Sequence, residues 1–192
     1  MDDLLEDISD LEKLIRDIPH YPETGVTFKD LFPVYNNRWG INELQEALSR
    51  DYHDLERLDK DNKVTKLVIA ASRGYILGSS VASFECVGLV AAHKNPRPIP
   101  QYNVQYYREY GENQGLYIDQ GLIEPGEHVI LHDDVLATGG TIVAMKELVH
   151  LAGGIVRGVI LSCELEYLNG RDHLIQSGLE NDQIKSVLKL AS

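Results

Sequence analysis

The sequence predicts an α/β fold in which helices flank a mainly parallel, twisted β-sheet. Short runs of almost continuous hydrophobicity are typical of strands that are covered on both faces. Four such runs occur, at residues 63–70, 86–92, 128–133 and 154–165. Segments of helical character separate several of them, and strands that alternate with helices join through right-handed crossovers into a parallel sheet.

The 192 residues allow one domain with an appended segment. Apolar residues at helical spacing predict a first helix over residues 3–18, which Pro19 ends. An irregular segment with three prolines follows, "PHYPETGVTFKDLFPVY". A second amphipathic helix is predicted over about 40–58. Its apolar face consists of Ile41, Leu44, Leu48, Tyr52, Leu55 and Leu58.

Two more helices, at residues 74–84 and about 141–152, connect the predicted strands. The connection between the second and third strands has another character, with prolines, a cluster of tyrosines, and weak strand signals near 103–108 and 115–119. So long a connection inside a compact domain usually has a function. We therefore expect residues 92–119 to form a flexible flap over the open edge of a site.

The bulk composition excludes some classes of protein. A formal net charge of -12 argues against a nucleic-acid binder, which usually carries a basic surface. No apolar stretch is long enough to cross a bilayer, and the acidic start "MDDLLEDISD" is unlike a signal peptide, so we expect a cytoplasmic protein. Cys86 and Cys163 lie in apolar runs and are expected as reduced core residues.

The segment "HDDVLATGGT", residues 132–141, has the composition of an anion-binding turn at the end of a strand. Ala137, Gly139 and Gly140 have little or no side chain to keep an anion from the backbone N–H groups. The hydroxyls of Thr138 and Thr141 add donors, and the following helix presents its N-terminus. We call residues 137–141 the phosphate cup.

Two acids precede the phosphate cup, Asp133 and Asp134. They would repel a phosphate, but ionised carboxylates accept hydrogen bonds from a sugar diol and can lie close to Mg²⁺. The pattern therefore favours a ribose 5-phosphate as ligand. For an arbitrary pair of acids before a turn, the alternative is a polar turn with a capping threonine.

"DDVLATGGT" resembles the phosphoribosyl pyrophosphate (PRPP) signature of the type I phosphoribosyltransferases, and looks most like its adenine phosphoribosyltransferase version. Other segments are similar to this family in the same order along the chain. They are the base-binding segment (21–34), the pyrophosphate loop with its helix (71–82), the two parts of the flap (93–100 and 106–111) and a C-terminal region (168–174). The resemblance implies the type I phosphoribosyltransferase fold, with a helix and hood-like base-binding segment at 1–40 and the core at 41–192.

The resemblance also implies roles for individual residues. Asp133, Asp134 and the phosphate cup would hold the ribose and 5-phosphate of PRPP. The residues implied for the pyrophosphate are Ser72, Arg73, Gly74, His93, Lys94, Arg97 and Tyr110. Family members usually carry an arginine where His93 stands, and a neutral imidazole is a weaker, pH-dependent substitute. The residues implied for the base are Val26, Phe28, Lys29 and Val135, and Lys29 stands where an arginine is common.

The resemblance implies that Glu109 is the catalytic base, which would take the proton that the purine loses at N7 as its N9 attacks C1 of the ribose. The implied reaction is PRPP plus adenine giving AMP and pyrophosphate, in a homodimer. Mg²⁺ would be bound mainly through PRPP, since no local motif forms a separate metal site. Two alternatives stay open: transfer to another base such as uracil, and a non-catalytic PRPP-sensing domain.

Overall fold

The computed structural model describes residues 7–21, 24–106 and 114–191. The chain divides into two compact units, Met1–Ala47 and Leu48–Ser192. The boundary that we predicted near residue 40 stays a prediction. Helix α2 (Arg38–Arg57) begins in the first unit, and its second half belongs to the second.

In the first unit, a 3-10 helix, η1 (Ile8–Leu14), precedes strands β1 (Arg16–Pro19) and β2 (Thr27–Asp30) and the short helix α1 (Phe32–Asn36). The expected helix over 3–18 is therefore wrong in its last turn, where residues 16–19 form a strand. These residues instead pair with β2 in an antiparallel ladder, and two ion pairs cross the strands. Arg16 binds the buried Asp30 at 2.5 Å, and Lys29 binds Asp17 at 3.0 Å.

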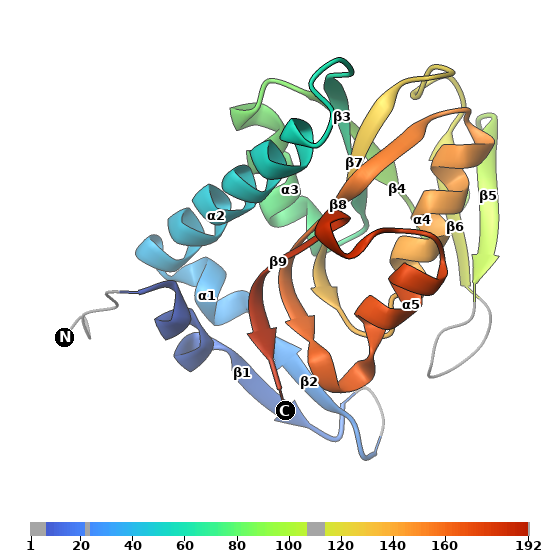
Figure 1. Cartoon of the computed structure of the whole chain (residues 1–192). Helices are drawn as coiled ribbons and strands as arrows, with labels where there is room; N and C mark the ends of the chain where they lie inside the picture. The colour runs from blue at the N-terminus through green and yellow to red at the C-terminus, as the bar shows by residue number, and fades with distance from the viewer. Residues whose placement is uncertain (1–6, 22–23, 107–113, 192) are drawn as a thin grey trace. The chain divides into compact units, whose positions relative to one another are not determined.

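The second unit contains a five-stranded sheet in the order β4-β3-β7-β8-β9, in which every pair of neighbours is parallel (Figure 1). Its strands are β3 (Val64–Ala70), β4 (Gly88–Ala92), β7 (His128–Leu136), β8 (Ile155–Leu165) and β9 (Ile184–Leu190). The mainly parallel sheet and its four predicted strands are confirmed. Strand β9 was not predicted, because polar residues interrupt its apolar ones.

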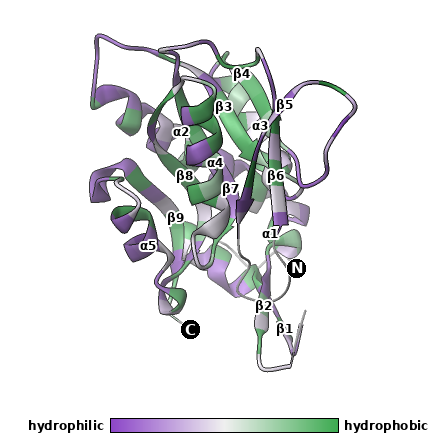
Figure 2. Cartoon of the chain, turned by 90° about the vertical axis from the view of Figure 1, so that its right-hand side faces the viewer, coloured by the Kyte–Doolittle hydropathy of each residue, from purple (hydrophilic) through white to green (hydrophobic). Residues whose placement is uncertain are grey.

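Helices cover both faces of this sheet (Figure 1). The second half of α2 and helix α3 (Gly74–Phe84) lie on one face, and helix α4 (Gly140–Leu151) lies on the other. The strands between them are mostly hydrophobic (Figure 2). The apolar face of α2 is buried at Leu48, Tyr52 and Leu55, whereas Leu58 is exposed because the helix ends one residue before it.

Strands β5 (Gln101–Tyr106) and β6 (Gln114–Asp119) form an antiparallel pair, which confirms the strand signals predicted near 103–108 and 115–119. The pair packs beside α4, and Val104, Leu116 and Ile118 are buried in the same core as the sheet. The flap role of residues 92–119 stays a prediction.

A C-terminal segment follows β8: two 3-10 helices, η2 (Glu166–Leu168) and η3 (Asn181–Gln183), lie on either side of helix α5 (Gly170–Gln176). Cys163 is buried and free, as expected, but Cys86 is exposed. Cys86 adopts a left-handed conformation (φ 56°) just after α3, and the N–H of the next residue returns to Ala82 O at 3.0 Å. This helix-ending turn points away from the core. Among the described residues, no helix is long and apolar enough to span a membrane.

Candidate functional site

The carboxyl ends of β4, β3 and β7 lie side by side, because these strands are parallel neighbours. Three predicted site segments follow or end these strands: residues 93–97, residues 72–74 and residues 133–141. In parallel α/β sheets, ligands bind outside this edge. The fold thus brings together segments that are far apart in the sequence.

The phosphate cup lies between β7 and α4 and borders an open hollow of about 260 Å³. The hollow is lined by Asp133, Val135, Leu136, Ala137, Thr138, Gly139, Gly140, Thr141 and Ile142. Gly139 has a φ of 86°, which only glycine adopts without strain, and it directly precedes α4. This left-handed turn gives the N-terminus of a twelve-residue helix the backbone geometry of an anion site.

The two acids belong to β7 itself, which continues to Leu136 and not only to residue 133 as predicted. Asp133 lines the hollow, whereas the buried Asp134 forms an ion pair with Arg73 (Nε to Oδ2, 2.8 Å). Burial, followed by the neighbouring Asp134 carboxylate, raises the pKa of Asp133 well above its ordinary value. A cation that entered the hollow would therefore favour the ionised form of Asp133.

The turn Ser72-Arg73-Gly74 follows β3, with a cis peptide bond between Ala71 and Ser72. Helix α3 begins at Gly74, and a β-carbon there would lie 3.4 Å from Asp133 Oδ1. The predicted pyrophosphate turn and the acid pair are thus in contact.

The basic cluster follows β4. His93 exchanges two backbone hydrogen bonds of 2.8 Å with Tyr117, and its Nδ1 lies 3.4 Å from the hydroxyl of Tyr75. Burial, and then the charge of Arg97, lower the pKa of His93, which favours the neutral imidazole. Arg97 itself forms an ion pair with Asp119 at the end of β6. Its positive charge is therefore compensated within this part of the chain.

The residues predicted for the base divide between the units. Val135 lines the hollow, while Val26, Phe28 and Lys29 belong to the unit Met1–Ala47. In that unit, the half-buried Phe28 makes an edge-to-face contact with Tyr21, with ring centroids 5.3 Å apart. Glu109 and Tyr110 lie outside the described residues, so their predicted roles are not tested.

Two contacts to the phosphate cup were not predicted from the sequence. The hydroxyl of Thr141 lies 3.5 Å from that of Tyr106 at the end of β5, and His173 of α5 binds the Thr138 carbonyl at 2.8 Å. No local pattern signals either contact, because both partners come from distant elements. Among the described residues, no group of three or more His, Cys, Asp or Glu could hold a metal ion.

Similarity to known proteins identifies the family, although no family model matches the chain. The adenine phosphoribosyltransferase of Leuconostoc citreum is 36% identical over 172 residues, which cover 89% of this chain and 93% of that protein. The chain belongs to the adenine phosphoribosyltransferase family.

Solved structures of adenine phosphoribosyltransferases have the same fold. The Thermoanaerobacter pseudethanolicus protein superposes with a TM-score of 0.84 at 32% identity, covering 96% of this chain and all of that one (100%). The Giardia lamblia protein, solved in complex with 9-deazaadenine, gives a TM-score of 0.85 at 31% identity, covering 97% and 99%. The predicted type I phosphoribosyltransferase fold is thereby confirmed.

Proposed function

We propose that this chain transfers the 5-phosphoribosyl group of PRPP to adenine, giving AMP and pyrophosphate. The observation that carries the proposal is the hollow between Asp133 and the phosphate cup, beside the Arg73 turn, at the carboxyl edge of a parallel sheet. Membership of the adenine phosphoribosyltransferase family supports both the reaction and the base.

The phosphate cup is assigned to the 5-phosphate. Backbone N–H groups of the turn and the N-terminus of α4 favour an anion there, and Thr138 and Thr141 add hydroxyl donors. Asp133 and Asp134 are assigned to the ribose hydroxyls, which donate to carboxylate acceptors. The ion pair with Arg73 offsets the negative charge of Asp134 and limits the repulsion between the acids and the ligand's phosphates.

The turn Ser72-Arg73-Gly74 and the basic cluster are assigned to the pyrophosphate. Arg73 offers a planar set of donors suited to phosphate oxygens. The flap side contributes His93, Lys94, Arg97 and Tyr110. Arg97 would exchange Asp119 for the more highly charged pyrophosphate, so binding of the leaving group changes a contact inside the β5–β6 region.

The base site is assigned to four residues, Val26, Phe28, Lys29 and Val135. Phe28 would stack on the purine, backbone groups at Val26 and Lys29 would read its edge, and Val135 would cover the opposite face. Because the backbone of Lys29, and not its side chain, would contact the base edge, the side chain would keep its ion pair with Asp17.

In the proposed reaction, the bond from C1 of the ribose to the pyrophosphate oxygen breaks as the bond from C1 to N9 of adenine forms. The transition state resembles an oxocarbenium ion. Glu109 accepts the proton that the purine loses at N7, and Arg73 with the flap cations stabilises the departing pyrophosphate. Closure of residues 92–119 over the site would exclude water, which otherwise hydrolyses the activated sugar.

Mg²⁺ enters this scheme as part of the substrate, the Mg–PRPP complex. The described residues fit that arrangement, because Mg²⁺ usually keeps several waters and binds through one or two carboxylates plus substrate phosphates, and Asp133 is such a carboxylate beside the hollow. When bound, the ion offsets negative charge on the pyrophosphate.

We also propose a homodimer. Two large apolar side chains are exposed near the edge strand β4, Phe84 (66% exposed) and Leu89 (43% exposed), which supports a covered surface there. Sedimentation at micromolar concentration should give the mass of two chains; a single species with the mass of one chain would contradict the proposal.

The reaction is tested by one set of assays with PRPP and Mg²⁺. Adenine, guanine, hypoxanthine, uracil and orotate are offered separately, and nucleotide and pyrophosphate are measured. We expect AMP from adenine and no product from the other bases. Turnover with another base would overturn the base assignment, and PRPP binding without any turnover would favour the sensing domain.

The general base is tested by Glu109→Gln. This change should lower kcat by about 10²-fold or more and leave PRPP affinity nearly unchanged, because it removes only proton transfer. Glu112→Gln, in the same segment, is the matched control. An unchanged kcat would show that Glu109 is not the general base.

Asp134→Asn should weaken PRPP binding in a calorimetric titration, and an unchanged PRPP affinity would contradict the contact of Asp134 with the ribose.

A further inference from the structure

The first turn of α5 lies directly behind the phosphate cup. The Nδ1 of His173 donates a hydrogen bond to the carbonyl oxygen of Thr138 at 2.8 Å. Gly170 packs so closely that a β-carbon on it would overlap the Ala137 carbonyl oxygen. A β-carbon on Gly139 would in turn lie 3.0 Å from the Gly170 carbonyl oxygen. Two successive carbonyls, those of Ala137 and Thr138, therefore face α5.

This contact sets the direction of the N–H groups of the cup. In a planar trans peptide, the C=O of one residue and the N–H of the next point in opposite directions. The peptide bonds after Ala137 and Thr138 are trans, so the N–H groups of Thr138 and Gly139 point away from α5. The lining of the hollow consists of residues of β7, the cup and α4 and includes none of α5, as expected if these N–H groups face it.

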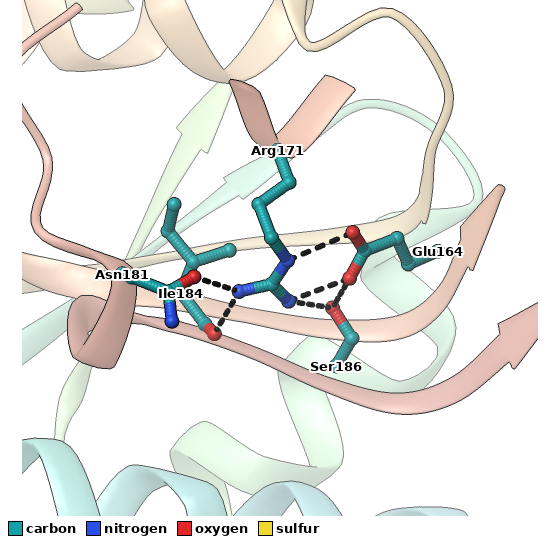
Figure 3. A network of polar contacts seen from close by, with 5 residues as sticks. All are labelled: Glu164, Arg171, Asn181, Ile184 and Ser186. Carbon is teal, nitrogen blue, oxygen red and sulfur yellow. Dashed lines mark hydrogen bonds and ion pairs between the residues drawn. The ribbon is translucent and has the colours of Figure 1, made fainter. Parts of the chain in front are cut away.

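Helix α5 is itself fixed to the sheet (Figure 3). The guanidinium of Arg171 binds both carboxylate oxygens of the buried Glu164 on β8, at 2.9 and 2.6 Å. It also binds Ser186 on β9 and the carbonyl oxygen of Ile184, at 3.3 and 3.0 Å. Residue 171 lies between the two residues that touch the cup, so this network holds their turn in place.

We propose that the first turn of α5 orients the phosphate cup, and that His173 is a positioning residue for the 5-phosphate of substrate and product. The carbonyl of Thr138 only accepts hydrogen bonds, so Nδ1 of His173 carries a proton in the neutral and in the cationic imidazole. His173 fixes a carbonyl, and thereby the N–H group behind it, without touching the ligand. The inference rests on the proposed function for the identity of the ligand that carries the phosphate.

The test compares ligands with and without the phosphate. Calorimetric titrations use ribose 5-phosphate, AMP and adenine with the full chain and three variants. His173→Leu removes the donor, His173→Asn keeps an N–H donor at the position of Nδ1, and Gln176→Leu is the matched control at another exposed residue of α5. The melting temperature of each variant is measured to check that the fold is retained.

We expect His173→Leu to weaken ribose 5-phosphate and AMP about fivefold, the effect of one lost hydrogen bond, and to leave adenine affinity unchanged. The KM for PRPP should rise by a similar factor at nearly constant kcat, because the 5-phosphate does not react. His173→Asn should restore binding, and Gln176→Leu should bind like the native protein.

Three outcomes would overturn the inference: unchanged affinity for the phosphate ligands in His173→Leu, an equal loss for adenine, or no rescue by His173→Asn. If the native protein binds ribose 5-phosphate but not adenine, the proposed base is wrong. The role of α5 is then tested by the ribose 5-phosphate affinities of the variants alone. A native protein that binds neither phosphate ligand would overturn the cup and the role of α5 together.

Discussion

The network around Glu164 gives a prediction for stability. Arg171→Met removes five hydrogen bonds of the guanidinium, which bind Glu164 twice and also Asn181, Ile184 and Ser186. Only 3% of Glu164 is exposed, so the variant leaves a buried carboxylate with the Ser186 hydroxyl at 2.7 Å as the partner that remains in this network.

The loss of unfolding free energy in Arg171→Met follows from the unpaired charge of Glu164. Removing one partner of a buried ion pair costs about 3–5 kcal/mol. A slope of about 2 kcal/mol per molar urea converts this cost into a midpoint that falls by roughly 1.5–2.5 M. The double variant Glu164→Gln with Arg171→Met removes the orphaned charge and should be more stable than Arg171→Met alone.

The contribution of Glu164 to the stability of the protein depends on pH with a definite sign. Burial raises the pKa of Glu164, but the hydrogen bonds from Arg171 and Ser186 outweigh it and lower the pKa below the ordinary value of 4.5. In the native protein, the ionised Glu164 therefore stabilises the fold at pH values above 4.5. This contribution is lost as the pH falls through the lower pKa of the folded state. Without Arg171, burial dominates and the carboxyl protonates at a higher pH. The deficit of Arg171→Met should therefore shrink as the pH falls.

Urea unfolding followed by circular dichroism at pH 7.5 and pH 5 measures both effects. The control is Arg57→Met, which breaks an exposed ion pair with Asp54 and should cost less than about 1 kcal/mol. The reasoning is refuted if Arg171→Met costs no more than this control, or if the double variant is less stable than Arg171→Met.

Three further predictions concern single residues. Gly170→Ala should lower the free energy of unfolding by about 1–3 kcal/mol and weaken ribose 5-phosphate binding, because its methyl group would collide with the Ala137 carbonyl. Thr141→Val should weaken ribose 5-phosphate about fivefold, whereas Tyr106→Phe should not, if the phosphate replaces Tyr106 as the partner of the Thr141 hydroxyl. Asp51→Asn should raise the melting temperature at pH 8 but not at pH 4, because burial raises the pKa of Asp51 to about 6.

Gly88→Ala is the control for Gly170→Ala, since its methyl group would meet only the flexible Lys66 side chain closely, at 3.2 Å. Equal losses in binding from the two alanine variants would refute the cup collision. Equal losses from Thr141→Val and Tyr106→Phe would show that the tyrosine itself serves the ligand. For an acid whose folded pKa is raised, stability is lost as the pH rises through that pKa, so an Asp51→Asn variant with no gain at pH 8 would contradict its burial.

Local sequence patterns identified much of the fold. Strands β3, β7 and β8 carry continuous apolar runs because both of their faces are covered, and the phosphate cup is visible because its small residues are contiguous in the chain. Strand β9 has no such run, because lysine and serine residues interrupt it, so no local signal marks it. The run of helical spacing extends into residues 16–19, but these residues form a strand by pairing with residues 27–30, which are distant along the chain.

The sequence by itself determined the parallel sheet, the cup and the family resemblance, because each depends on residues that are neighbours along the chain. The tertiary structure alone decided that Asp134 pairs with Arg73, so that Asp133 faces the hollow. It also decided that His173 meets Thr138, 35 residues away. These contacts arise where strand ends and helix ends converge at one edge of the sheet. Partners of that kind leave no periodicity in the sequence, since each is set by the packing of elements that are distant in the chain.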